Sequence, residues 1–170
     1  MIIYRLANLS DVKKLSILLK QVYIHTYGVE GVTDEFANFI TDKFSEENIK
    51  KNIETNPDSY IVADQDTNLL GAVEIIYDAE SPIGNVKAPE LSKLYILEWF
   101  CGKGIGAKLI EATENTLLKN GYKEYWLWVL ISNERAISFY NKHGFKSMGT
   151  ALFHMEKNTY DNYVMYKSIE

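Results

Sequence analysis

The sequence predicts an α/β (α+β) fold in which about seven β-strands form a central sheet flanked by about four to five helices. Helical and extended segments are interspersed along the chain, because apolar residues recur every three or four positions in some segments and alternate or run continuously in others. Hydrophobic residues make up 46% of the chain and charged residues 24%, as in an ordinary globular core. The 170 residues are close to the roughly 150 of one domain, and no repeat or linker divides them. Residues 1–170 are therefore expected to form a single domain.

The first third of the chain predicts one strand and three helices. Residues 2–6 read as a strand, and Asn8, Ser10 and Asp11 after it are residue types that cap helices. A helix is expected from Val12 to near Gly28, since its apolar residues gather on one side. Two more helices are expected over roughly 33–44 and 45–56, and the second of these stops at Asn56-Pro57.

The middle of the chain changes to an extended pattern. Residues 60–63 and 70–77 predict an antiparallel hairpin, because the segment between them is rich in turn-forming residues. Residues 78–89 contain three turn-forming Pro and Gly positions, Pro82, Gly84 and Pro89, and read as a long surface loop. A further strand is expected over 91–97.

The last third predicts two helices and three strands. A helix begins near Ile105 and ends at Asn120-Gly121, and a second is opened by 132–134 and closed by His143-Gly144. Residues 125–131 are apolar at both odd and even positions, so this strand is expected in the interior of the sheet. Residues 145–148 and 162–168 read as closing strands, joined by a loop through Lys157, Asn158 and Tyr160.

Charge and cysteine content exclude several classes of protein. The net charge of −5 and the pI near 5.3 argue against a nucleic-acid-binding domain and suit a cationic small molecule. A single cysteine, Cys101, provides neither an internal disulfide nor a cysteine-paired zinc site, so no metal and a reducing, cytoplasmic location are expected. No signal peptide and no apolar stretch long enough to cross a bilayer is visible, so no membrane partner is expected.

A glycine cluster lies where a strand passes into a helix. Gly102, Gly104 and Gly106 leave backbone N–H groups accessible, and the start of a helix favours a bound phosphate, so the cluster predicts a pyrophosphate site. The alternative is a glycine-rich turn that only enters a helix. The dinucleotide fingerprint G-x-G-x-x-G/A also fits through Ala107, but it should follow the first strand of a repeated strand-helix unit, and Glu124 precedes its strand instead of ending it.

A second cluster follows about thirty residues later, in NERAISFYNKHGF. Asn133, Ala136 and Tyr140 are spaced by three and four residues and therefore share one helix face, with Tyr140 on the last turn. Its hydroxyl could reach a neighbouring cleft. The alternative is a half-buried core tyrosine, because the chain contains twelve tyrosines.

Taken together, LSKLYIL, CGKGIGAK and NERAISFYNKHGF, within residues 91–145, resemble the acetyl-coenzyme A-dependent GNAT superfamily of N-acetyltransferases. The resemblance implies a mixed, mostly antiparallel, splayed sheet and acetyl-coenzyme A as co-substrate. The full-length pattern, including FITDKFSEENIKKNIE and FHMEKNTYDNYVMYKSI, is similar to the spermidine/spermine acetyltransferases of the PaiA type. It implies a small polyamine as the acetyl acceptor and leaves a homodimer possible.

The resemblance also implies which residues bind the coenzyme. They are Leu94, Tyr95 and Ile96, whose backbone would pair with the pantetheine arm; Cys101, Gly102, Lys103, Gly104, Ile105, Gly106 and Ala107 in the pyrophosphate loop; and Asn133, Ala136 and Tyr140. The chain departs from the family at Cys101, where Gln or Arg is usual. Lys103 could replace the lost polar contact to phosphate, and a role for Cys101 as a reactive nucleophile is the alternative.

For catalysis, the resemblance implies that Tyr140 protonates the departing thiolate. A phenol is a suitable acid for a thiolate of comparable basicity. The base is open among Glu90, which shares strand parity with Leu94, then His154, and third Glu74, expected to face the substrate or solvent. Glu90 could instead be a solvent-facing charge, and His154 a hydrogen-bonded structural residue.

Two other functions stay open, namely acetylation of a protein N-terminus or lysine, and a non-catalytic module that senses acetyl-coenzyme A and acts through partner contacts.

Several side chains between the first helix and the hairpin could contact the acceptor. The acids are Glu30, Asp34, Glu35, Asp42, Glu46 and Glu47, and the aromatic residues are Tyr23, Tyr27, Phe36 and Phe39. The acids could attract a polyammonium ligand or be solvated helix faces, and the aromatic residues could be core, interface or a cation-binding wall, with core favoured for the two phenylalanines.

Overall fold

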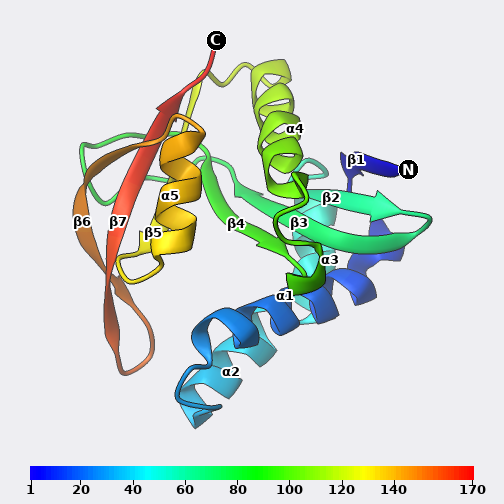
Figure 1. Cartoon of the computed structure of the whole chain (residues 1–170), viewed down its shortest axis with the longest axis horizontal. Coiled ribbons are helices and arrows are strands. Elements are labelled where there is room, and N and C mark those ends of the chain that lie inside the picture. Colours follow the sequence, from blue (N-terminus) through cyan, green and yellow to red (C-terminus); the bar gives the residue numbers. More distant parts are fainter. The chain divides into compact units, whose positions relative to one another are not determined.

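A computed structural model describes all residues, Met1–Glu170, and confirms the expected α/β fold. The strands are β1 (Ile2–Leu6), β2 (Tyr60–Gln65), β3 (Asn68–Ile76), β4 (Glu90–Ile96), β5 (Glu124–Leu130), β6 (Lys146–His154) and β7 (Thr159–Ser168). The helices are α1 (Val12–Tyr27), α2 (Asp34–Lys43), α3 (Glu46–Thr55), α4 (Ile105–Lys119) and α5 (Glu134–Lys142), with short 3₁₀ helices η1 (Leu9–Asp11) and η2 (Glu98–Phe100). Figure 1 shows these elements along the chain.

The seven strands form one open sheet in the order β1-β2-β3-β4-β5-β7-β6. Pairs β1/β2, β2/β3, β5/β7 and β6/β7 are antiparallel, whereas β4 and β5 run parallel and pair at Glu90 and Trp126. The interior position of the strand at 125–131 is confirmed, since β5 lies between β4 and β7.

The chain folds as two compact units. The N-terminal unit comprises Met1–Glu74 and Lys93–Thr113, and the C-terminal unit comprises Ile75–Ser92 and Glu114–Glu170. The chain passes from one unit to the other within β3, within β4 and within α4.

An aromatic cluster centred on Tyr23 joins α1 and α2 in the N-terminal unit. The Tyr23 ring lies 4.7 Å from Tyr27, 5.3 Å from Phe36 and 5.2 Å from Phe39, measured between ring centroids. Tyr23 is buried, and the other three rings are partly buried against the same core. The core option, favoured from the sequence for the two phenylalanines, therefore agrees with their packing.

Strand β1 is fastened by a guanidinium between two buried carboxylates. Arg5 donates to Asp11 Oδ2 at 2.7 Å and to Asp64 Oδ2 at 2.6 Å. Burial alone would raise the pKa of Asp11, but hydrogen bonds from Arg5 and from the Asn8 backbone hold this pKa below its usual value. Among the residues expected to cap helices, Asn8 caps η1. Asp11 directly precedes α1, but its side chain binds Arg5 and makes no capping hydrogen bond to α1.

The β2/β3 hairpin is confirmed and its strands are longer than expected. Asp66 and Thr67 adopt positive φ of 53° and 71°, as in a two-residue hairpin turn, so pairing extends to Gln65 and Asn68. The turn-forming residues Asp64 and Asn68 therefore lie in strands.

The last two strands are also longer than the sequence predicted, and they form a long hairpin (Figure 1). The prediction of a strand ending at Met148 is wrong, because Gly149, with φ of 136°, lies at a register shift in β6 and pairing continues beyond it to His154. The prediction of Tyr160 in the connecting loop is wrong as well, since Tyr160 pairs with Phe153.

The segment 78–89 differs from the expected surface loop. Ser81 and Ala88 are buried, and the Ala88 N–H donates to the Ala79 carbonyl at 3.1 Å. Ile83 and Val86 pack against a small core that contains Trp126, so the apolar residues of this segment cover one side of β5.

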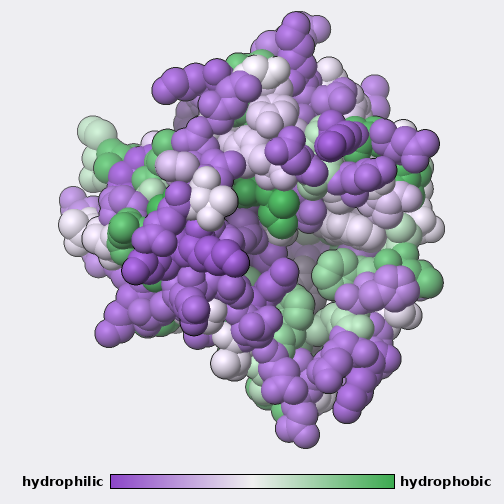
Figure 2. Space-filling model, turned by 180° about the vertical axis from the view of Figure 1, so that it is seen from behind, coloured by the Kyte–Doolittle hydropathy of each residue, from purple (hydrophilic) through white to green (hydrophobic).

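Hydrophilic residues cover most of the face shown in Figure 2, and hydrophobic residues occur there in small separate groups. Among the helices, none combines the length and the apolar character that crossing a membrane requires.

Candidate functional site

The glycine loop of the N-terminal unit is an open backbone surface at the start of a helix. Gly102 and Gly104 adopt left-handed φ of 74° and 80°, which disfavours any other residue. A Cβ added at either position would have no atom within 4 Å. The space in front of the loop can therefore admit a ligand close to the backbone.

Helix α4 begins directly after this loop. The Lys108 N–H donates to the Gly104 carbonyl at 3.2 Å, so the first helical turn opens at Gly104. The N–H groups of a first turn have no intrahelical acceptor, and the helix dipole adds a partial positive charge there. Ile105 and Gly106 are buried, which holds this turn in place. The donors and the open space fit the diphosphate of a coenzyme.

The side chains at Cys101 and Lys103 are engaged within the loop region. The Cys101 Sγ lies 3.7 Å from the Ile96 carbonyl and 3.8 Å from the Leu97 carbonyl, so the thiol faces the end of β4. The Lys103 ammonium lies 5.1 Å from the centroid of the Phe100 ring, a cation–π distance. Lys103 is exposed, so its ammonium stays accessible to a phosphate at the loop.

The predicted pantetheine segment, Leu94, Tyr95 and Ile96, forms the second half of β4 and is partly buried. It packs closely on β3, because a Cβ at Gly71 would lie 2.9 Å from the Tyr95 carbonyl oxygen. The Leu97 N–H donates to the Leu70 carbonyl at 3.0 Å. The backbone of this segment therefore lies directly against β3.

In the C-terminal unit, Ala136 and Tyr140 lie four residues apart in α5, and Asn133 directly precedes this helix. Asn133 is the N-cap of α5, and its Oδ1 accepts from the Ala136 N–H at 3.1 Å. Tyr140 is 9% exposed and its ring packs on Phe145 at a centroid distance of 5.4 Å.

The candidate bases occupy different environments. Glu90, the first residue of β4, is partly buried, whereas His154, the last residue of β6, is exposed and pairs with Thr159. Of the two environments expected for Glu74, facing the substrate or facing solvent, the exposed one is wrong. Its side chain is 13% exposed and lies 2.9 Å from the Lys93 ammonium.

Sequence reasoning missed the polar cluster around Glu74. The Tyr60 hydroxyl donates to Glu74 Oε1 at 2.6 Å, and Asn52 donates to the Tyr60 hydroxyl at 3.1 Å. Burial, followed by the nearby Glu74 charge, raises the pKa of Tyr60 and keeps its hydroxyl protonated. A lysine inside the largely apolar segment LSKLYIL was the signal that a carboxylate partner was needed.

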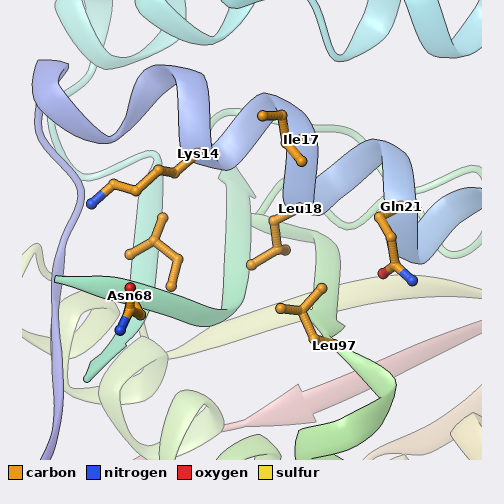
Figure 3. Close-up of a pocket in the computed structure, with 7 residues that line it drawn as sticks. Lys14, Ile17, Leu18, Gln21, Asn68 and Leu97 are labelled. Atoms are coloured by element: carbon orange, nitrogen blue, oxygen red, sulfur yellow. The ribbon is translucent and has the colours of Figure 1, made fainter. Parts of the chain in front are cut away.

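A pocket of about 300 Å³ lies elsewhere in the N-terminal unit, against α1 (Figure 3). Leu18 and Leu97 point toward each other across it, with Lys14 and Gln21 on either side. Its lining is Lys14, Ile17, Leu18, Gln21, Asn68, Leu69 and Leu97. None of these is a predicted site residue. No group of three or more His, Cys, Asp or Glu side chains is arranged to hold a metal ion.

Comparisons with known proteins place the chain in a family. Residues 25–145 match the model of the acetyltransferase (GNAT) family. An uncharacterised N-acetyltransferase of Archaeoglobus fulgidus is 34% identical over 121 residues, which are 71% of this chain and 79% of that protein. A second, from Mycobacterium bovis, is 29% identical over 136 residues, 80% of this chain and 83% of that protein.

The fold is also that of a solved acetyltransferase. The crystal structure of the PaiA N-acetyltransferase from Thermoplasma acidophilum in complex with coenzyme A superposes with a TM-score of 0.76, covers 99% of both chains and is 24% identical. The residues that match the family model make up most of the sequence and include both the glycine loop and helix α5 with Tyr140. The chain therefore belongs to the GNAT family and is an acetyl-coenzyme A-dependent N-acetyltransferase.

Proposed function

We propose that this enzyme acetylates a primary amine of a small polyamine such as spermidine or spermine, as a PaiA-type acetyltransferase. The net charge of −5 favours a polycationic acceptor over an anionic one. Asp34, Asp42 and Glu46 on α2 and α3 are exposed and add negative charge to the N-terminal unit. The fold match to the PaiA N-acetyltransferase of Thermoplasma acidophilum supports the PaiA-type assignment.

The open glycine loop is the observation that carries the donor half of this proposal. Backbone N–H groups of residues 101–107 would bind the diphosphate, and the backbone of residues 94–96 would pair with the pantetheine arm. In Asn133, Oδ1 already caps α5 through Ala136, so the side-chain Nδ2 is the group that would donate to the coenzyme.

Tyr140 is the proposed general acid. Its Oη–H bond would break as the thioester C–S bond breaks, the proton would move to the thiolate sulfur, and the phenolate would regain a proton from solvent. A polyamine nitrogen is protonated near neutral pH and must lose a proton before attack. Glu90, which is partly buried, is the first candidate to accept it, and His154 is the second.

A thiol-release assay with polyamines, amino acids, aminoglycosides and peptides tests the substrate. We expect turnover with spermidine and spermine and an increase in product mass of one acetyl group. Release with peptides alone would indicate a protein acetyltransferase, and coenzyme binding without release would indicate a sensing module.

Replacement of Tyr140 tests the acid. Tyr140→Phe should lower kcat by about 10²- to 10⁴-fold while coenzyme affinity stays nearly unchanged. Tyr160→Phe is the control, because Tyr160 is an exposed tyrosine on β7 and has no proposed role. Wild-type kcat in Tyr140→Phe would show that Tyr140 is not the general acid.

The pH dependence of kcat/KM separates the two bases. The variant that lacks the true base, Glu90→Gln or His154→Ala, should lose the limb of the profile on which activity rises with pH. Unchanged profiles in both variants would point to a water relay.

A further inference from the structure

Three polar side chains from separate secondary-structure elements form a compact cluster in the C-terminal unit. The Tyr125 hydroxyl donates to Glu114 Oε1 at 2.7 Å, and the Lys167 ammonium donates to the same oxygen. Tyr125 is fully buried, while the side chains of Glu114 and Lys167 are 22% and 19% exposed. We call Glu114, Tyr125 and Lys167 the polar clamp.

One aromatic residue, Phe145, lies between the polar clamp and Tyr140 and packs against both. Phe145 packs edge-on against Tyr125 at 4.9 Å and against Tyr140 at 5.4 Å, between ring centroids. The Lys167 ammonium lies 5.9 Å from the centroid of the Phe145 ring. Since Phe145 is only 2% exposed, the ring of Tyr140 rests on a fully packed support.

The backbone after α5 makes the same connection. The Phe145 N–H donates to the Tyr140 carbonyl at 3.1 Å, and Gly144 adopts a left-handed φ of 86° to allow this turn. The side chain of Lys167 covers Gly144, with its Cε 3.4 Å from the place of a Cβ. Lys167 therefore contacts both the turn and the ring that hold Tyr140.

We propose that the polar clamp positions Tyr140, so that Glu114, Tyr125 and Lys167 set the placement of the phenol that protonates the thiolate. This inference rests on the proposed role of Tyr140. The Glu114–Lys167 ion pair is partly exposed, and ion pairs open to solvent usually contribute little to stability, which favours a positioning role. Burial and the adjacent Glu114 raise the pKa of Tyr125, and its hydroxyl therefore stays a donor across the working pH range.

The test compares two hydrogen bonds that tyrosines of the same sheet donate to glutamates. Tyr125→Phe removes the clamp hydroxyl, and Tyr166→Phe removes the hydroxyl that Tyr166 donates to Glu124. Misplacement of a catalytic group by about 1 Å can cost about 10²-fold, so we expect Tyr125→Phe to lower kcat by about 10- to 100-fold with KM for acetyl-coenzyme A unchanged. Tyr166→Phe should retain wild-type kcat.

A double variant then shows whether the effect passes through Tyr140. In the Tyr140→Phe background, Tyr125→Phe should lower kcat no further, because there is no hydroxyl left to misplace. Independent, multiplying losses would overturn the proposal, as would wild-type kcat in Tyr125→Phe when Tyr140→Phe alone is slow. Wild-type kcat in Tyr140→Phe would instead refute the proposed acid.

A third variant guards against misfolding. If Tyr125→Phe does not fold, Lys167→Met keeps an unbranched apolar side chain over Gly144 and removes the ammonium bound to Glu114. The same loss of kcat is expected for Lys167→Met at a temperature where circular dichroism shows it to be folded. A folded Lys167→Met variant with wild-type kcat would overturn the proposal.

Discussion

Replacing Gly104 by alanine separates the ligand-binding role of the glycine loop from its backbone conformation. Gly104 has φ of 80°, and a left-handed backbone costs an alanine about 1–2 kcal/mol. For a chain of this size, that loss lowers Tm by about 2–8 °C. The added methyl would meet no protein atom within 4 Å, so no further destabilisation is expected.

The effect on the coenzyme should be larger than the effect on stability. The methyl would occupy the space in front of the first turn of α4, where the diphosphate is proposed to bind. Loss of one hydrogen bond to a charged group costs about 1.5–3 kcal/mol, which corresponds to about 10- to 150-fold weaker binding. Calorimetric titration with coenzyme A measures this affinity.

Gly121 is the matched control for Gly104. It lies just beyond the opposite end of α4, has φ of 85° and likewise has no atom within 4 Å of an added Cβ. Gly121→Ala should therefore lower Tm by the same amount as Gly104→Ala, while its affinity for coenzyme A stays that of the wild type. Equal affinities in the two variants would refute the assignment of the diphosphate to this loop.

Three further predictions concern the fold. The pKa of Asp11 is lower in the folded chain than in the unfolded chain, so its contribution to stability is present above about pH 4 and is lost as pH falls through the folded pKa. Urea unfolding from pH 3 to 6 should therefore show that the free energy of unfolding falls less steeply with acidification in Asp11→Asn than in the wild type. Equal slopes in the two proteins would contradict this. Gly71→Ala should lower the free energy of unfolding by about 1–3 kcal/mol, because the methyl would lie 2.9 Å from the Tyr95 carbonyl oxygen and 3.1 Å from Ile96 Cγ1; a Tm equal to wild type would show that β3 and β4 adjust freely. Since the chain crosses between the two units within β3, β4 and α4, we expect one cooperative thermal transition, with far-UV and near-UV circular dichroism curves coinciding; two separate transitions would contradict a single domain.

Local chemistry could be read from the sequence because it depends on near neighbours. Helices were expected to begin near Thr33, Ser45 and Asn133, and these three residues cap α2, α3 and α5, each accepting from an N–H three residues later. The glycine loop between β4 and α4, and the position of Tyr140 within a helix, also followed from the sequence. The interior position of β5 followed from its apolar residues at both parities.

Tertiary structure decided which distant side chains meet. Glu74 is paired with Lys93 across 19 positions, and Glu114 with Lys167 across 53, and no local pattern encodes either choice. The extent of β6 was likewise set by its register with β7, which continues past the bulge at Gly149. Helix and strand periods specify which face of an element is apolar, whereas the partner of a buried charge is chosen only when the elements pack and water is removed.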